Sequence, residues 1–482
     1  MTAEAAASDP DLSLLGPHSL LHEYCDDARW GMAVVRATVL EAAHPQIGAA
    51  LIENSTFVAH PWRRIFNTLT SVQRVLDADT RVRDREAARL NRLHARISGV
   101  DAQGRSYSAM DPDARAWVVG SLFESTVELN RMSGRSMDGP ELEILYAEFR
   151  AFLALLEGNA DHLPATVAEF WPYFDDMIDC GLENTEAMRV ILFELFGRMP
   201  APPLLRDHPA FWAAGRVVAG PVIAEFLKAS LPEEIRRRAG LGELPGSRLL
   251  ARGVYLGSGV ASWLLPHSWT RTDTVLGLLD PSRTDGTGAH LLDALQRQRG
   301  RAAALLRLIS PISLDEPSGG SAARSADRFF TEVLDQTGDG YVSWPDLAAM
   351  AREVASRLDL DADGEERLFD AFAAWWRELA AELDADGDGR VDRQEYAAAA
   401  SSLASPALVR VAEVLFEACD ADHDETISAA EYEALFRTAF ARDVNAGDQD
   451  ARFTRGRFVR EFLDFMAGRH GSAGYDSLLS QP

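Results

Sequence analysis

Between residues 17 and 271, apolar residues recur mostly at spacings of three and four positions, which is the repeat of an amphipathic α-helix. Runs of alternating β-branched residues are missing, so strands are not expected here. Proline stands in the first turn of several predicted helices, where its missing N–H would have no intrahelical acceptor. These starts are Asp111-Pro112, Gly139-Pro140, Leu163-Pro164 and Leu231-Pro232. The pattern predicts an all-α bundle.

The helical repeat breaks at residues 280–288 and again at 311–323, on either side of one predicted helix near residues 291–308. The second break contains Glu316-Pro-Ser-Gly-Gly-Ser, which has the composition of a flexible linker. We therefore predict a helical domain at residues 1–275, a linker with one helix at 276–325, a second domain at 326–470 and a tail at 471–482.

The second domain contains a segment, residues 384–395, whose oxygen donors have the spacing of a twelve-residue EF-hand calcium loop. The predicted ligands are Asp384, Asp386, Asp388, the backbone carbonyl of Arg390 and a bidentate Glu395. Gly389 occupies position 6, where the chain turns sharply, and Val391 at position 8 is predicted to pair with a second loop. The segment predicts a calcium site, and the alternative is a solvated acidic loop.

Two more segments fit the same pattern less fully. The predicted ligands are Asp335, Thr337, Asp339, Tyr341 and Asp346 in one, and Asp420, Asp422, Asp424, Thr426 and Glu431 in the other. Residues 335–346 have a neutral side chain at position 3 and a short Asp at position 12, so weaker binding is expected. Residues 420–431 carry Glu425 at position 6, where a positive φ costs about 1–2 kcal/mol. A fourth loop at 446–457, with Phe453 at position 8 and Arg457 at position 12, is predicted to pair but not to bind.

The negative charge is concentrated in the segment that contains the predicted calcium loops. The formal net charge is -26, and residues 327–446 alone carry 28 Asp and Glu against 10 Lys and Arg. No basic stripe is present to neutralise phosphates, which excludes a nucleic-acid partner.

The three cysteines are far apart without a C-x-x-C pair, so no disulfide framework is expected. No signal peptide or apolar run of about 18 residues is present, and we expect a cytoplasmic protein without a transmembrane segment.

Seven blocks of the first domain occur in the order of a known family. They are Gly16-Pro17 with Asp27-Ala28-Arg29, Glu41-Ala-Ala-His44-Pro45, Pro61-Trp-Arg-Arg64-Ile-Phe-Asn-Thr68, Arg92-Leu-His94-Ala-Arg96-Ile-Ser-Gly99, Tyr107-Ser-Ala-Met-Asp111-Pro112, Leu163-Pro164-Ala-Thr166 and Leu231-Pro232. The domain resembles the rubber oxygenase (latex clearing protein) and MpaB-type oxygenases, which are helical heme b proteins. The second domain resembles sarcoplasmic calcium-binding proteins. The expected fold is a helical oxygenase-like bundle followed by an EF-hand domain.

The resemblance implies a heme b cofactor and names its neighbours. His94 lies on the apolar stripe of a predicted helix and would be the axial ligand; the alternative is a core histidine bound to a backbone carbonyl. Arg64 and Thr68, one helical turn apart, match family residues beside the heme, where Arg64 could pair with a propionate. The alternative for Arg64 is an arginine at the edge of an ordinary amphipathic helix. His44 is a weaker ligand candidate, and His60-Pro61 more simply marks a helix start.

The chain also departs from the family. Asn67 stands where rubber oxygenases carry lysine, Val119 stands where the family has histidine, and the family's E-H-S reads Glu53-Asn54-Ser55. Glu53 could still act as a base, so the predicted catalytic residues are Arg64, Thr68 and Glu53. The leading hypothesis is a calcium-modulated heme oxygenase acting on an apolar small molecule.

Two alternatives remain. One is a non-catalytic calcium buffer or sensor whose helical domain has degenerated. The other, less favoured, is a class I terpene synthase, because Asp175, Asp176 and Asp179 form a D-D-x-x-D sequence. No second metal motif follows this sequence, so these acids are read as a solvated helix face.

Overall fold

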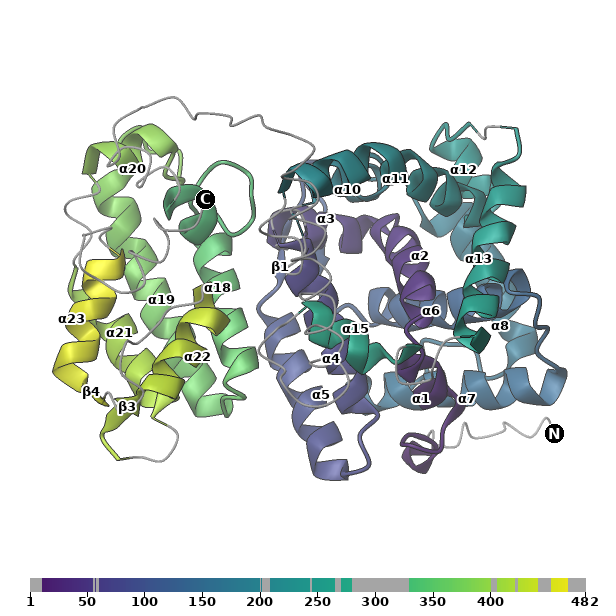
Figure 1. Ribbon diagram of the computed structural model, residues 1–482, viewed down its shortest axis with the longest axis horizontal. Coiled ribbons are helices and arrows are strands. Elements are labelled where there is room, and N and C mark those ends of the chain that lie inside the picture. The colour runs from purple at the N-terminus through teal and green to yellow at the C-terminus, as the bar shows by residue number, and fades with distance from the viewer. Residues whose placement is uncertain are drawn as a thin grey trace, which may run out of the picture. The chain divides into compact units, whose positions relative to one another are not determined.

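The computed structural model describes residues 11–54, 57, 60–199, 201, 209–242, 245–264, 270–279, 329–399, 405–420, 424–440 and 452–466. The chain divides into two compact units, residues 1–53 with 61–312, and residues 54–60 with 313–482 (Figure 1). The predicted helix near residues 291–308 and the predicted tail at 471–482 lie outside the described residues. No described helix has the length and apolar character needed to cross a membrane.

The first unit is helical apart from one short hairpin. Its helices are α1 (Leu20–Asp26), α2 (Trp30–Ala42), α3 (Pro45–Asn54), α4 (Pro61–Val75), α5 (Thr80–Ala95), α6 (Pro112–Met132), α7 (Gly139–Glu157), α8 (Val167–Asp176), α9 (Glu186–Arg189), α10 (Phe196–Arg198), α11 (Pro209–Ser230), α12 (Glu233–Arg238), α13 (Ser247–Leu264) and α15 (Thr272–Leu279), with short turns η1 (Leu12–Leu14), η2 (Met177–Gly181) and η3 (Val190–Leu195). The hairpin strands are β1 (Ser98–Val100) and β2 (Ser106–Ser108). The all-α prediction is confirmed for this region.

Proline and side-chain caps set most of the helix starts. The Asp111 carboxylate accepts a hydrogen bond from the Ala114 N–H at 2.9 Å, and Pro112 follows as the first residue of α6. The predicted start at Leu163-Pro164 is wrong by three residues, because the Thr166 hydroxyl caps the chain there and α8 begins at Val167. Helix α4 begins at Pro61, as predicted from His60-Pro61.

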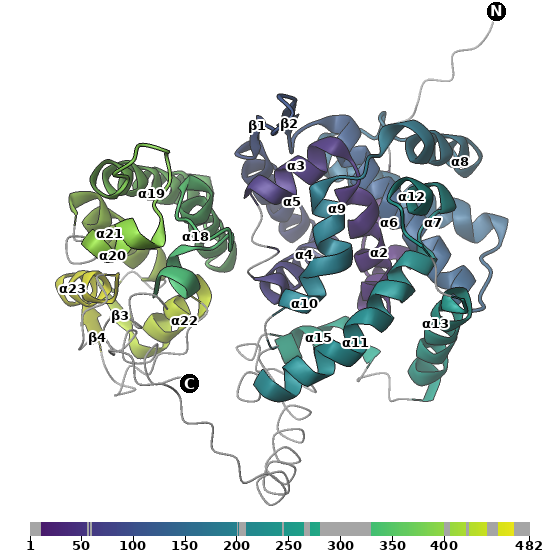
Figure 2. The same ribbon diagram turned by 90° about the horizontal axis from the view of Figure 1, so that it is seen from above.

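Helices α2 and α6 lie side by side in the middle of the unit (Figures 1 and 2). Trp117 of α6 is fully buried, and its indole N–H donates to the Leu40 carbonyl of α2 at 3.1 Å. The two helices also share a buried ion pair, in which Arg36 binds Glu124 and donates to Ser125 Oγ at 2.8 Å. Buried charges are tolerated only when they are paired in this way, so the pair fixes how α2 and α6 align.

The second unit consists of η5 (Phe330–Leu334), α18 (Trp344–Arg357), α19 (Ala362–Leu383), α20 (Arg393–Ala399), α21 (Pro406–Cys419), α22 (Ala429–Phe440) and α23 (Arg455–Met466), with strands β3 (Thr426–Ser428) and β4 (Arg452–Thr454). Aromatic side chains fill its core. Phe330 packs on Tyr396 with ring centroids 5.4 Å apart, and Tyr432 stacks on Phe453 at 4.3 Å. The first contact joins the segment before the loop at 335–346 to the helix after the loop at 384–395, and the second joins α22 to strand β4.

Candidate functional site

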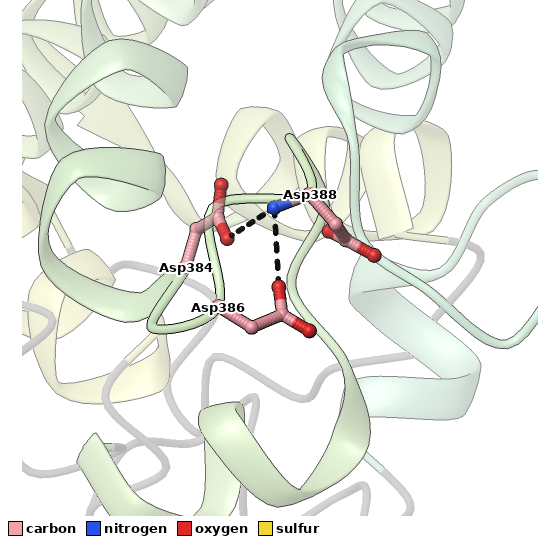
Figure 3. Close-up of side chains that lie close together, drawn as sticks. All are labelled: Asp384, Asp386 and Asp388. Atoms are coloured by element: carbon pink, nitrogen blue, oxygen red, sulfur yellow. Dashed lines mark hydrogen bonds between the residues drawn. The ribbon is translucent and has the colours of Figure 1, made fainter.

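The loop at residues 384–395 joins α19 to α20 and folds around its own carboxylates (Figure 3). Asp384 Oδ1 accepts from the Gly387 N–H at 2.7 Å, and Oδ2 accepts from the Gly389 N–H at 2.9 Å. Carboxylate oxygens of Asp384, Asp386 and Asp388 lie within 4.8 Å of one another. Two oxygens bound to one Ca²⁺ ion are at most about 5 Å apart, so this donor set fits calcium.

Glu395, the last residue of this loop, connects the first turn of α20 to the start of the loop. Glu395 Oε1 accepts from the Ala385 N–H at 2.8 Å, and Oε2 accepts from the Asp392 N–H at 2.9 Å. Gly389 has φ of 82°, the left-handed conformation that glycine adopts without a Cβ penalty. Arg390 follows at position 7, where its N–H donates to Asp388 Oδ1 at 2.8 Å.

The loop at residues 335–346 repeats this pattern. Asp335 accepts from the N–H groups of Gly338 at 2.6 Å and Gly340 at 3.0 Å, and Asp346 accepts from the Thr337 N–H at 2.8 Å. Asp346 is fully buried, and burial raises its pKa to about 6. Thr337 Oγ1 is buried in the same loop. Asp339 and Tyr341 occupy positions 5 and 7, with the Tyr341 N–H donating to Asp339 at 2.9 Å.

Position 8 joins the two loops as an antiparallel bridge. The Val342 N–H donates to the Val391 carbonyl at 2.9 Å, and the Val391 N–H donates back at the same distance. Both valines are fully buried. The prediction that Val391 pairs with a second loop is confirmed, and the bridge makes the two loops one structural unit.

The loop at residues 420–431 is described only in part, because Asp422 lies outside the described residues. Asp420 accepts from the Asp424 N–H at 3.0 Å and from the Glu425 N–H at 3.1 Å. The Thr426 N–H donates to Asp424 at 2.8 Å, and Glu431 accepts from the Ser428 N–H at 2.8 Å. All four hydrogen bonds occur at the same positions in the loop at residues 384–395.

Glu425 has φ of 64°, so the strained turn predicted at this position is confirmed. Strand β3 pairs with β4 with Ile427 opposite Phe453, which confirms that the fourth loop pairs with the third. Its acidic positions 448 and 450 lie outside the described residues. Arg457, at position 12 of that loop, is a cation that cannot chelate calcium and instead binds Glu461 at 2.8 Å.

In the first unit, the predicted heme neighbours lie on the α4–α5 hairpin, whose helices lie side by side (Figure 1). Arg64 and Thr68 belong to α4, and His94 belongs to the last turn of α5. The short connection at residues 76–79 closes the hairpin at one end, so Arg64 and His94 lie toward the other. The His94 side chain is half-buried, with Nδ1 inaccessible to solvent.

Arg64 faces a second charged group, Glu41 at the end of α2. Among the described residues Arg64 has no hydrogen bond or ion pair, and its side chain is exposed to solvent. Burial raises the pKa of Glu41 to about 7, against the effects of Arg64 and of a weak hydrogen bond from Ser121 Oγ at 3.5 Å. Both side chains keep accessible surface. The Arg64 charge is thus open to solvent, whereas Glu41 is half-buried.

Glu53, the predicted base, lies near the end of α3. Its Oε2 accepts a hydrogen bond from the Tyr107 hydroxyl of β2 at 2.7 Å. The neighbouring Asn54 belongs to the other unit, and Ser55 lies outside the described residues. Glu53 is thus held by a residue that the sequence does not single out as its partner.

The terpene-synthase alternative gains nothing from the structure. Asp175, Asp176 and Asp179 are exposed, and they do not form a three-carboxylate group of metal-binding size; the group found in the described part of the chain is that of Asp384. Glu41 and Tyr107 neighbour predicted site residues, and the sequence analysis does not name them as candidates. Both stand in the blocks quoted for the family, so their position there was the available signal.

Comparisons with known protein families found one match in the first unit and one in the second. Residues 22–261 match the sequence profile of the "ER-bound oxygenase mpaB/B'/Rubber oxygenase, catalytic domain" family, and residues 381–398 match an EF hand. The N-terminal domain resembles this oxygenase family. The matched region contains every residue predicted to surround a heme. A comparison with curated proteins gave no match.

Two solved structures resemble part of the chain. One is described as "Structural basis for prokaryotic calcium-mediated regulation by a Streptomyces coelicolor calcium-binding protein", with 23% identity, 30% of this chain and 98% of that chain covered, and a TM-score of 0.26. The other is a coelenterazine-binding protein from Renilla muelleri in its calcium-loaded apo form, with 19% identity, 34% and 100% covered, and a TM-score of 0.24.

Calcium should raise the melting temperature of the full chain, because an ion at a hundredfold excess over its Kd stabilises the folded state by about 2.7 kcal/mol. Glu395→Gln should reduce this gain most, since it removes the bidentate closure, and Asp346→Asn should reduce it less. Glu425→Gly should strengthen its loop by relieving about 1–2 kcal/mol of strain. Differential scanning calorimetry with calcium or chelator measures all three, and equal gains in Glu395→Gln and wild type would contradict the assignment.

Glu41 should make stability depend on pH. Its folded pKa of about 7 lies above the ordinary value of 4.5, so the folded state binds more protons between these values and stability should fall as pH rises through that window. Glu41→Gln should flatten the decline, because the glutamine does not titrate. Chemical unfolding from pH 4.5 to 7.5 measures the difference, with Glu128→Gln as the control; parallel curves for Glu41→Gln and wild type would contradict the placement of Glu41.

Proposed function

We propose that this chain is a calcium-binding protein whose N-terminal domain is a heme b-dependent oxygenase for an apolar small molecule, with calcium modulating that domain. One observation carries the proposal. Arg64, Thr68 and His94 lie on the α4–α5 hairpin, and the whole hairpin belongs to the segment that matches the oxygenase family. The EF hand at residues 381–398 supports the calcium half.

The residues present suit a heme in their chemistry. His94 would bind the iron, because a half-buried imidazole in a helical wall is a common axial ligand. Arg64 has no anionic partner within ion-pair distance among the described residues, so its guanidinium is available to a propionate. Bound heme would supply oxygen activation. The chain's own residues would supply charge and proton acceptance.

Glu53 is the residue we assign to proton acceptance from the substrate. Its Oε2 is engaged by Tyr107, and Glu53 forms no other hydrogen bond with the described residues, so Oε1 can accept a proton. Arg64 and Thr68 would bind and orient anionic or polar groups on the same side of α4.

A non-catalytic calcium buffer or sensor is the rival function. It is favoured by Asn67, which directly precedes Thr68 and lacks the charge of the lysine at the matching position of rubber oxygenases. In that case the first unit would be a helical scaffold and calcium binding would be the activity. The two functions differ in whether purified protein takes up heme.

Hemin added to the full chain should produce a Soret band, and His94→Ala should remove or strongly shift it because the axial ligand is lost. His44→Ala is the control: it removes another imidazole of the same unit, half-buried at the end of α2, and should leave the band in place. A spectrum of His94→Ala identical to that of the wild type would overturn the ligand assignment. No Soret band in the wild type would support the buffer.

A further inference from the structure

We infer that Tyr107 is a positioning residue for Glu53, and that the missing side chain at Gly99 leaves room for the Tyr107 ring. The inference rests on the proposed function for the catalytic role of Glu53, whereas the contact between the two side chains does not. The Tyr107 side chain is 5% exposed, and its hydroxyl lies 2.7 Å from Glu53 Oε2. A phenol donating to a carboxylate forms a charge-assisted hydrogen bond, which is stronger than a neutral one.

The hairpin β1–β2 brings the tyrosine to this position. In its antiparallel register Gly99 lies directly opposite Tyr107. The turn between the strands is held by Asp101, whose Oδ1 accepts from the N–H groups of Gln103 at 3.0 Å and Arg105 at 2.8 Å. A hairpin fixed at its turn presents its cross-strand pair in one orientation.

Gly99 is required because the tyrosine ring lies across it. A Cβ atom at position 99 would stand 2.6 Å from the Tyr107 hydroxyl oxygen and 2.8 Å from Cζ, which is shorter than real Cβ contacts. The ring would have to move, and this movement would disturb the contact between its hydroxyl and Glu53. Gly99 therefore matters because the Tyr107 ring occupies the space where a Cβ atom would be, and not because of its backbone conformation.

A second set of hydrogen bonds connects the β1–β2 hairpin to α3. The Ser108 N–H donates to Gln46 Oε1 at 3.3 Å, and Gln46 Nε2 donates to Asp111 Oδ2 at 3.1 Å. Gln46 and Glu53 are seven residues apart on α3, so they lie on one face of that helix. The hairpin contacts this face at two points, and the Glu53 carboxylate is held at the second.

The consequence is a base with one oxygen anchored and one oxygen free. The hydrogen bond restricts rotation of the Glu53 side chain, so Oε1 keeps one direction toward whatever C–H or O–H group it deprotonates. Small errors in the position of a reacting group reduce rates by up to about a hundredfold. Removing the phenol should therefore impair turnover while leaving substrate binding intact.

The contact is tested by ¹³C NMR on the full chain labelled at tyrosine Cζ, with the Tyr107 resonance identified by its loss in Tyr107→Phe. Glu53→Gln and Gly99→Ala should each move this resonance. Gly139→Ala should not, since a Cβ at position 139 meets nothing within 4 Å. Tyr146, whose hydroxyl donates to the Pro164 carbonyl at 2.8 Å, is the internal reference. An unmoved Tyr107 resonance in Glu53→Gln would overturn the inference.

The positioning role is tested by oxygen uptake of the hemin-loaded full chain with squalene as the apolar probe. Tyr107→Phe should lower kcat on the order of tenfold with KM unchanged, and Glu53→Gln should lower it by about a hundredfold or more. Tyr146→Phe is the matched control and should leave both constants unchanged. An unchanged kcat in Tyr107→Phe would overturn the positioning role. No uptake in the wild type would count against the proposed function, while the NMR result would still decide the contact.

Discussion

The calcium loops depend on one kind of interaction, the hydrogen bonds that a carboxylate accepts from backbone N–H groups of its own loop. Asp384 accepts from Gly387 and Gly389, and Asp335 accepts from Gly338 and Gly340, in the same positions of the two loops. These bonds curl the chain around the acids and bring their oxygens toward one volume. Without them, like charges would separate in the absence of an ion.

The closing carboxylates extend this constraint to the helices. Glu395 is in the first turn of α20 and Asp346 is in the first turn of α18, and each binds backbone N–H groups at the start of its loop. A cation bound to these carboxylates would therefore stabilise the angle between the helices on either side of the loop. The Val342–Val391 bridge links the two loops, so an ion bound in one would also stabilise the backbone of the other.

The calcium loops could be predicted in detail because their ligands lie within twelve consecutive residues. The pairing of Val391, the strained φ of Glu425 and the pairing of Phe453 all follow from fixed loop positions. The start of α8 was misplaced for a similarly local reason, since the cap at Thr166 outweighed the proline at 164. Long-range contacts are different. Tyr107 and Glu53 are 54 positions apart, and Arg36 and Glu124 are 88 apart, so no local sequence pattern identifies these residues as partners.

Calorimetric titration of calcium into the full chain tests most directly whether these loops are ion sites. The geometry at residues 335–346 and 384–395, together with the same hydrogen bonds at 420–431, predicts three ions per chain, with one fewer in Glu395→Gln. Binding of no ion, or of one, would contradict the account, because it would mean that acidic turns can form these hydrogen bonds without forming a calcium site.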